Sequence, residues 1–269
     1  MNILQAVAQT LARVREKKPL VHHVTNYVTA TDCANIALAA GASPVMAGEM
    51  AEVEDMASLA SALVINIGTL TVQSVEAMIA AGKRAVELGI PVVFDPVGAG
   101  ATRLRTRAAE RIIREVRPSV IRGNMSEIKM LAGLDVNIKG VDSAADESDS
   151  AAVARDLAQR LDCVVAITGK RDIVAQGHNI CRIDNGHVLL SAVTGTGCMT
   201  STLAGCCCGA LKDPFVGTAA GIAFMGIAGE IAQQSLKPGE GIGTFRGRLF
   251  DALWNMTPEI VLRYGKINI

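Results

Sequence analysis

Apolar and polar positions along the chain follow two patterns that alternate from the amino terminus onward. Residues 1–16 repeat apolar positions at the spacing of a helix with one buried face, whereas runs such as VVF are continuous, as in strands covered on both faces of a sheet. The predicted helices are 1–16, 32–40, 72–89, 103–116, 124–133 and 151–162, and the predicted strands are 20–25, 62–70, 90–97, 119–123 and 163–169.

The last third of the chain has a different pattern. The stretches DIVAQGHN and ICRIDNGHVLL alternate apolar and polar residues, which predicts antiparallel strands with a hairpin turn at Asn185–Gly186. The polar, acidic segment 139–150 indicates a solvent loop. Three further helices are predicted at 199–211, 215–235 and about 245–263.

Strands alternating with helices predict an α/β layered fold with a mostly parallel central sheet flanked by helices. We expect residues 1–269 to form a single domain, because the only candidate boundary is the short segment 139–150. Ligands of such sheets bind beyond the carboxyl ends of the strands, so the loops that follow the strands are the places to look for chemistry.

Composition excludes several classes of protein. Lys and Arg total 26 and so do Asp and Glu, so the chain has no basic field for nucleic acid. Seven cysteines, three of them consecutive, do not resemble a disulfide framework and indicate a cytoplasmic protein. The amino terminus has no signal-peptide pattern. The apolar stretch 215–232 is interrupted by glycines, so we expect a buried helix and no membrane span.

Two of the strand-end loops carry carboxylates. Asp95 follows the apolar run VVF, where an unpaired carboxylate is costly to bury, so it either binds a cation or caps the turn at Pro96. Glu127 lies three residues after Asn124 at a helix start, where it either completes a capping box or reaches magnesium through water. Arg122, just before this helix, offers a planar fork suited to phosphate.

The other strand-end loops supply small and neutral residues. Asn26 follows HHVT, Gly68 permits close backbone approach in NIGTL, and Thr168 in ITGKRD could donate to a phosphate. Met46 lies in the loop GASPVMAG, where it either fills the core or lines a pocket for a flat apolar ligand.

The segment VTGTGC is a candidate anion-binding turn. Gly195 and Gly197 allow a tight loop that exposes backbone N–H groups at a helix start, and Cys198 follows at the helix N-terminus, where a lowered thiol pKa is expected. The chain contains no P-loop, no dinucleotide-binding glycine pattern and no G-x-S-x-G nucleophile motif.

Together these segments resemble the ribokinase-like superfamily and, within it, the hydroxyethylthiazole kinase family. The resemblance covers essentially the whole chain and rests on HHVTNYVT, GASPVMA, NIGTL, VFDPVGAGAT, RGNMSEI, ITGK and VTGTGC, in this order. It implies transfer of the ATP γ-phosphate to the primary hydroxyl of 4-methyl-5-(2-hydroxyethyl)thiazole in thiamine salvage. It further implies a chain without a lid that forms homotrimers, with active sites where subunits meet.

The resemblance also implies residue roles on the nucleotide side. Arg122 and Thr168 would contact ATP, while Asp95 and Glu127 would hold Mg²⁺ directly or through water. Phosphoryl transfer mainly requires positioning and charge stabilisation, which these residue types supply.

On the thiazole side, the resemblance assigns substrate contacts to Met46 and the backbone of Gly195, with Asn26 and Gly68 nearby. The turn Gly195, Thr196 and Gly197 would form the anion hole for the transferring phosphoryl group.

The superfamily generally has GTGD where this chain has GTGC, so Cys198 occupies the position of the proposed catalytic base. A thiolate beside ATP is disfavoured by the phosphate charges, and a loose transition state needs little help from a base. We therefore expect Cys198 to contribute modestly, or to be a small residue tolerated in a tight space. We expect Cys206, Cys207 and Cys208 to be packing residues.

Other functions fit some of the same loops. They resemble those of ADP/ATP-dependent dehydratases that repair hydrated nicotinamide cofactors, although such a large substrate would not need the compact Met46 loop. Hydroxymethylpyrimidine and pyridoxal kinases are the nearest other kinases, and a catalytically silent sensor is a further alternative, which the intact Asp95, Glu127 and Arg122 argue against.

Overall fold

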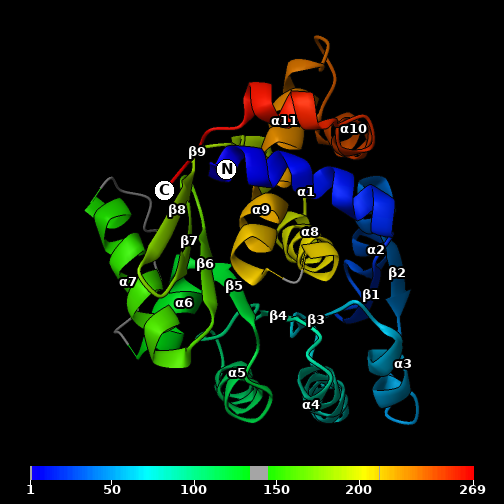
Figure 1. The fold of residues 1–269 in the computed structure, drawn as a ribbon, viewed down its shortest axis with the longest axis vertical. Helices are drawn as coiled ribbons and strands as arrows, with labels where there is room; N and C mark the ends of the chain where they lie inside the picture. Colours follow the sequence, from blue (N-terminus) through cyan, green and yellow to red (C-terminus); the bar gives the residue numbers. More distant parts are fainter. Residues whose placement is uncertain (1, 134–144, 212) are drawn as a thin grey trace.

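The computed structural model describes residues 2–133, 145–211 and 213–269. In this part of the chain nine strands form one sheet in the order β2-β1-β3-β4-β5-β6-β7-β8-β9 (Figure 1). Strands β1 to β6 pair in parallel and β6 to β9 pair antiparallel, which confirms the predicted α/β fold with a mostly parallel sheet. The strands are β1 (Leu20–Val24), β2 (Ser43–Met46), β3 (Ala62–Asn66), β4 (Val92–Asp95), β5 (Val120–Asn124), β6 (Val164–Thr168), β7 (Asp172–Gln176), β8 (Asn179–Ile183) and β9 (Ile267–Asn268).

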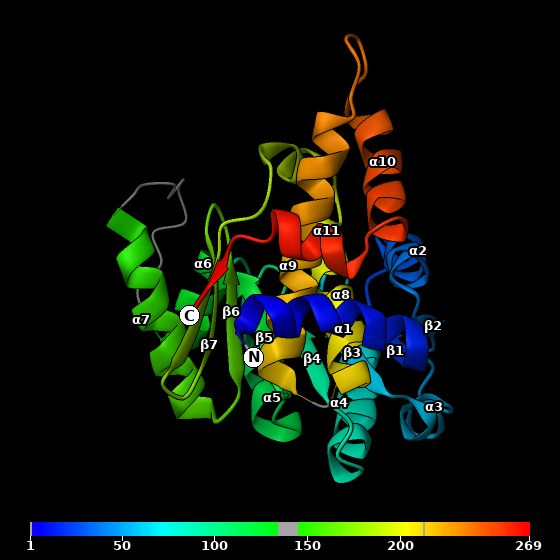
Figure 2. The same ribbon diagram turned by 45° about the horizontal axis from the view of Figure 1, so that its top comes forward.

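Helices cover both faces of the sheet (Figures 1 and 2). One face is covered by α1 (Ile3–Lys17), α2 (Ala30–Ala40), α8 (Thr196–Leu211), α9 (Pro214–Gln234), α10 (Ile242–Trp254) and α11 (Pro258–Tyr264). The other face is covered by α3 (Val53–Leu59), α4 (Val72–Glu87), α5 (Arg103–Val116), α6 (Met125–Ala132) and α7 (Ala145–Leu161). A short 3₁₀ helix, η1 (Val188–Ala192), precedes α8.

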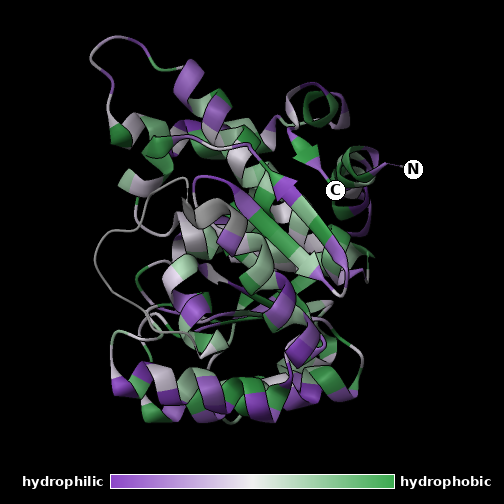
Figure 3. Cartoon of the chain, turned by 90° about the vertical axis from the view of Figure 1, so that its left-hand side faces the viewer, coloured by the Kyte–Doolittle hydropathy of each residue, from purple (hydrophilic) through white to green (hydrophobic). Residues whose placement is uncertain are grey.

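Alternating side chains of each strand feed two separate cores. In β3, Val64 points into the core beneath α8, and Leu63 and Ile65 point into the core beneath α4. All five residues of β3 are buried, which explains the continuous apolar run in the sequence. In Figure 3, hydrophobic residues colour much of the sheet, and the helices carry hydrophilic bands.

Helices α8 and α9 pack closely because small residues line their contact. A Cβ atom on Gly221 of α9 would lie 2.3 Å from the backbone nitrogen of Ala204 in α8, and one on Gly205 would lie 2.5 Å from Val64 in the sheet. Cys206, Cys207 and Cys208 are buried in this layer, as expected for packing residues. Helix α8 is thereby held directly against the sheet, with its first turn at the carboxyl ends of the strands.

Helix α9 is long and apolar enough to cross a membrane by length and composition. However, 89% of its most apolar 18-residue window is buried inside the protein. This burial is typical of the central helix of a layered fold.

The predicted position of the hairpin turn was wrong. The hairpin turn between β7 and β8 lies at Gly177–His178 rather than at Asn185–Gly186. Asn185 is buried instead, and its amide donates to the Tyr264 carbonyl at 2.9 Å and accepts from the Lys266 N–H at 2.7 Å. Its side chain thus joins the chain after β8 to the carboxyl terminus.

Three further differences from the prediction have identifiable causes. GASPVMAG contains the edge strand β2, which tolerates Pro44 because an edge strand leaves some N–H positions unpaired. The predicted helix 245–263 is two helices, and Pro258 begins the second. Of the predicted loop 139–150, residues 139–144 lie outside the described residues, and 145–150 belong to α7, since a polar run is compatible with a helix as well as with a loop.

Candidate active site

The predicted site residues gather at one edge of the sheet. The carboxyl ends of the parallel strands meet there, and the strand pairing places Asn66 beside Asp95 and Asn124 beside Thr168. The residues that end or follow these strands are Met46, Asn26, Asn66, Asp95, Asn124 and Thr168, in the order β2, β1, β3, β4, β5 and β6.

Arg122 of β5 connects several of the predicted residues. Its Nη1 lies 3.4 Å from Oδ2 of Asp95, and its Nη2 donates to Oγ1 of Thr168. A Cβ atom on Gly197 would lie only 3.0 Å from Nη1, so the glycine turn passes directly over the guanidinium. The Nε atom is buried without a described partner. Arg122 therefore brings a carboxylate, a hydroxyl and the glycine turn to one place.

Asp95 is fully buried at the end of β4. Its Oδ2 accepts from the hydroxyl of Ser201 at 2.8 Å, while Oδ1 has no described partner. Burial raises the pKa of Asp95, and the charge of Arg122 opposes this shift. Ser201, on the second turn of α8, did not emerge from the sequence because nothing in its surroundings distinguishes it from other small helical residues.

Glu127 completes a capping box at the start of α6. Its Oε2 accepts from the Asn124 N–H at 2.8 Å, and its Oε1 accepts from the Gly98 N–H, also at 2.8 Å. Burial and the nearby charge of Asp95 raise the pKa of Glu127. The sequence allowed either capping or a water-mediated contact with magnesium for Glu127, and the capping box is present. Because each carboxylate oxygen can accept more than one hydrogen bond, capping leaves room for a water-mediated contact with a cation.

The chemistry of these carboxylates fits Mg²⁺. Within the described ranges no three Asp, Glu, His or Cys side chains gather to form a metal cage. Mg²⁺ usually uses one or two carboxylates together with waters and substrate phosphates. The uncommitted Oδ1 of Asp95 and the neighbouring Glu127 match this donor set.

The glycine turn leads into the first turn of α8. Gly195 has φ +86°, and a Cβ atom there would lie 2.6 Å from Cγ2 of Thr29, so only glycine fits without strain. The helix begins at Thr196, three residues earlier than predicted, and Thr196 donates to the Leu190 carbonyl at 2.8 Å. The first N–H groups of a helix lack intrahelical partners, so this turn has the geometry of an anion site.

Cys198 lies within a group of amide side chains. Its sulfur accepts hydrogen bonds from Nδ2 of Asn66 at 3.2 Å and from Nδ2 of Asn26 at 3.4 Å. The expectation of a lowered pKa was wrong: burial raises the pKa of Cys198, and the charge of Asp95 raises it further. The thiol is therefore protonated at neutral pH.

Asn66 is the main residue that the sequence analysis missed. It is buried, and its Oδ1 accepts from Nδ2 of Asn26 and from the N–H of Gly68, both at 2.9 Å. A Cβ atom on Gly68 would lie 2.9 Å from the Asn26 amide, so the three residues pack tightly. A polar amide at the end of a fully apolar strand was the available signal.

Asp172, at the start of β7, lies next to the end of β6, at the Thr168 end of the row. Its Oδ1 accepts from the Gly169 N–H at 2.9 Å, next to Thr168. Burial raises its pKa to about 7, although the charge of Arg122 opposes the shift. Its sequence context did not single out Asp172, because an Asp at the start of a strand is usually exposed.

Met46 lies at the far end of the row and is 38% exposed at the end of β2. Three further exposed apolar residues are Tyr27 at 82%, Val28 at 57% and Met50 at 47%. They belong to the segments that follow the neighbouring strands β1 and β2. The Met46 end of the row therefore has exposed apolar residues in the segments that end or follow β1 and β2: Tyr27, Val28, Met46 and Met50.

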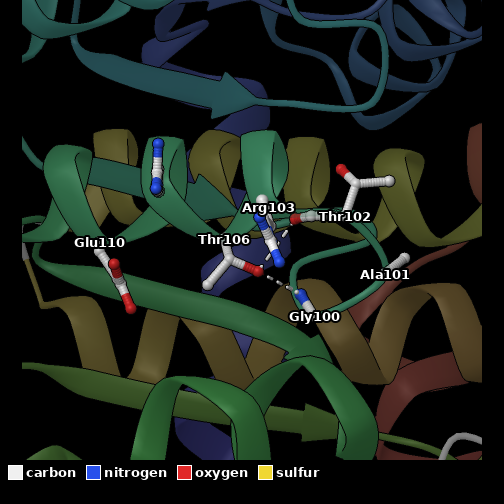
Figure 4. A pocket seen from close by; sticks show the side chains of 7 residues that line it. Gly100, Ala101, Thr102, Arg103, Thr106 and Glu110 are labelled. Atoms are coloured by element: carbon white, nitrogen blue, oxygen red, sulfur yellow. Dashed lines mark hydrogen bonds between the residues drawn. The ribbon is translucent and has the colours of Figure 1, made fainter.

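A separate hollow lies at the start of α5 (Figure 4). Its walls include Gly100, Thr102, Arg103, Thr106 and Glu110, and Oγ1 of Thr106 accepts from the Gly100 N–H at 3.1 Å. None of the predicted site residues lines it. The candidate site is the row of strand ends, and the hollow shares none of its residues.

Comparison with known proteins agrees with this geometry. The pattern of the hydroxyethylthiazole kinase family matches residues 11–259. A hydroxyethylthiazole kinase of Alkaliphilus oremlandii is 50% identical over 269 residues, which is 100% of this chain and 99% of that protein.

The chain belongs to the hydroxyethylthiazole kinase family.

A solved hydroxyethylthiazole kinase family structure, from Pyrococcus horikoshii, superposes with a TM-score of 0.88 at 39% identity, over 97% of this chain and 98% of that one. An ADP/ATP-dependent NAD(P)H-hydrate dehydratase from Bacillus subtilis superposes with a TM-score of 0.59 at 14% identity, over 89% of this chain and 90% of that one. The second similarity shows the shared fold alone. Membership of the kinase family rests on the whole-chain relatives, and it agrees with the resemblance found in the sequence.

Proposed function

We propose that the chain, acting as one domain over residues 1–269, transfers the γ-phosphoryl group of ATP to the primary hydroxyl of 4-methyl-5-(2-hydroxyethyl)thiazole in thiamine salvage. Membership of the family supports the reaction. The observation that carries the proposal is the convergence of Asp95, Thr168 and the Gly197 turn on Arg122. A guanidinium cation, a carboxylate that can hold Mg²⁺ and backbone N–H donors at one place suit a transferring phosphoryl group.

On the nucleotide side, Arg122 and Thr168 would contact the ATP phosphates. Asp95 and Glu127 would hold Mg²⁺, which neutralises charge on the phosphates when it is bound. The N–H groups of Gly195, Thr196 and Gly197 would receive the transferring group. Two buried atoms that have no described hydrogen-bond partner, Oδ1 of Asp95 and Nε of Arg122, support ligand contacts at this position.

On the alcohol side, Met46 and the Gly195 backbone would contact the thiazole, with Asn26 and Gly68 beside it. Cys198 would lie at the hydroxyl. Because its thiol is protonated at neutral pH, it would act by polar contact and space filling more than as a base. This role agrees with a loose transition state, in which the proton of the nucleophile leaves late.

We further propose a homotrimer with active sites between subunits. The set of exposed apolar residues Tyr27, Val28, Met46 and Met50 supports this assembly, because apolar side chains that are exposed in one chain can be buried against another. Its position next to the alcohol side would let a neighbouring subunit complete the site. A cytoplasmic location is supported by the seven cysteines, all of which are free.

The proposal is tested by ADP release with ATP, Mg²⁺ and, separately, hydroxyethylthiazole, hydroxymethylpyrimidine and pyridoxal. We expect turnover with the thiazole. Arg122→Met should lower kcat by about 10²-fold, the usual cost of removing a preorganised donor to developing charge. The matched control Arg107→Met, which changes an exposed arginine of α5, should leave it unchanged. Activity confined to the pyrimidine or the pyridoxal would contradict the proposal.

A further inference from the structure

Arg105 of α5 bonds to the loops after two different strands. Its Nη2 donates to the Gly68 carbonyl at 2.7 Å, and its Nη1 donates to the Ile67 and Val97 carbonyls, each at 2.8 Å. Ile67 and Gly68 follow β3, whereas Val97 follows β4. Within the described residues no carboxylate is paired with this guanidinium. Three backbone carbonyls therefore share one cation at the edge of the sheet where the site lies.

The stem of Arg105 also packs against the loop after β4. A Cβ atom on Gly98 would lie 3.0 Å from Cδ of Arg105, so the side chain runs directly along the backbone there. The N–H of Gly98 in turn donates to Oε1 of Glu127 at 2.8 Å. Gly98 thus connects the Arg105 side chain to Glu127, one of the two carboxylates proposed to hold Mg²⁺.

The other end of the bridge reaches the alcohol side. The N–H of Gly68 donates to Asn66, and Asn66 donates to the sulfur of Cys198. A shift of the Gly68 backbone would therefore move the amide that contacts the thiol. Arg105 is the residue that ties this backbone to the loop after β4.

The start of α5 is itself anchored to the loop after β4. Thr106 accepts from the Gly100 N–H and donates to the Thr102 carbonyl, both at 3.1 Å (Figure 4). The Arg105 N–H donates to Oγ1 of Thr102 at 3.3 Å. Helix and loop form one unit, from which the Arg105 side chain extends to the loop after β3.

We propose that Arg105 is a positioning residue that sets the spacing between the alcohol-binding loop after β3 and the metal-binding loop after β4. This inference rests on the proposed function, because that function assigns the two loops. A guanidinium has donors at fixed angles that can serve both loops at once, whereas a lysine ammonium is a point charge at the end of a flexible stem. A substitution of Arg105 should therefore weaken the affinity for the alcohol, although Arg105 itself would not contact the alcohol.

The test compares Arg105→Ala, Arg105→Lys and the control Arg107→Met. Thiazole binding is measured by calorimetry on the protein without nucleotide or metal, and kcat and both KM values are measured well below the melting temperature of each variant. We expect Arg105→Ala and Arg105→Lys to raise Kd and KM for the thiazole about tenfold or more. We expect millimolar guanidinium, but not methylammonium, to restore part of the activity of Arg105→Ala.

If Arg105→Ala is too unstable to assay, Arg105→Lys decides, since it keeps the charge and most of the packing. Thiazole Kd and KM within twofold of wild type in the folded variants, whatever their melting temperatures, would overturn the inference. So would a loss confined to KM for ATP. Failure of the proposed function is a different result, in which the wild-type chain itself does not phosphorylate the thiazole.

Discussion

At the scale of single residues, the surroundings of Cys198 determine what its thiol can do. Two amide nitrogens, from Asn26 and Asn66, donate to the sulfur, and Asp95 is close enough for its charge to disfavour a thiolate. The amide donors favour the thiolate, but burial and Asp95 outweigh them, so the pKa of Cys198 lies above its ordinary value. The helix N-terminus alone was a poor guide to this pKa.

This environment predicts the behaviour of substitutions at Cys198. Cys198→Ala should retain activity, with kcat lowered by about tenfold or less, below the 10²–10⁴-fold typical of a lost general base. Cys198→Asp should remain active, because it restores the carboxylate of the wider superfamily. Steady-state kinetics on both variants provide the measurement. Complete loss of activity in Cys198→Ala would contradict a modest role. An inactive Cys198→Asp would contradict the assignment of Cys198 to the position of the superfamily's catalytic base.

The pH dependence provides a second test of Cys198. A thiol with a raised pKa gains its negative charge only above its ordinary range, so a thiolate base would make the rate rise through pH 7 to 9. We expect parallel profiles of kcat for the wild type and Cys198→Ala over this range. A tenfold rise per pH unit in the wild type, absent in Cys198→Ala, would show that the thiolate is the base.

The sequence predicted which residues gather at the strand ends, but it did not predict all of the contacts among them. Asp95 and Thr168 could be assigned because each ends a strand, and Arg122 because it lies two residues before the end of β5, and parallel strand ends meet at one edge. Asn66 also ends a strand, yet its importance depends on the register that places it beside Asp95 and under Cys198. Such a contact joins segments far apart in the chain, and local pattern cannot supply it.

At the scale of elements, the approach of α8 to α9 sets where the glycine turn lies. The Cβ position of Gly221 is 2.3 Å from the backbone of α8, so the helices touch through their main chains. A side chain there would push α8 away from α9 and toward the sheet. Because Gly197 and Cys198 belong to the first turn of α8, this packing also controls their distance from Arg122.

Gly221→Ala should therefore lower the free energy of unfolding by about 3 kcal/mol, in the upper part of the range for overpacking. The control Gly247→Ala lies at an exposed position in α10 with no atom within 4 Å of the new Cβ. It should stabilise the protein by about 0.5–1 kcal/mol, since alanine favours helix. Urea unfolding measures both. Equal stabilities of the two variants would contradict the close packing.

Elements with local start and stop signals were predicted well. Helix α5 has its predicted bounds, because Thr102 caps its first turn and the chain leaves the helix at Arg117, before Pro118. Edge strand β2 was missed because it is short and contains Pro44. The turn at Asn185–Gly186 was wrong since tertiary hydrogen bonds to Asn185 outweighed its local turn preference.

At the scale of the whole molecule, the exposed apolar residues Tyr27, Val28, Met46 and Met50 predict assembly. We expect light scattering to give three times the chain mass of 28.1 kDa. Val28→Asp should shift the protein toward monomer and lower activity, because a buried unpaired carboxylate is costly. Leu59→Asp, at an exposed apolar residue that precedes β3, should leave both unchanged. A monomeric, fully active wild type would contradict the assembly.

The central claim is transfer of the ATP γ-phosphoryl group to the hydroxyethyl oxygen of the thiazole. The most direct measurement incubates the protein with Mg²⁺, hydroxyethylthiazole and ATP labelled in the γ-phosphate, and identifies the product by ³¹P nuclear magnetic resonance and mass spectrometry. The account predicts one labelled phosphomonoester on the primary alcohol for each ADP formed. Label found only in inorganic phosphate, with the thiazole unchanged, would contradict it.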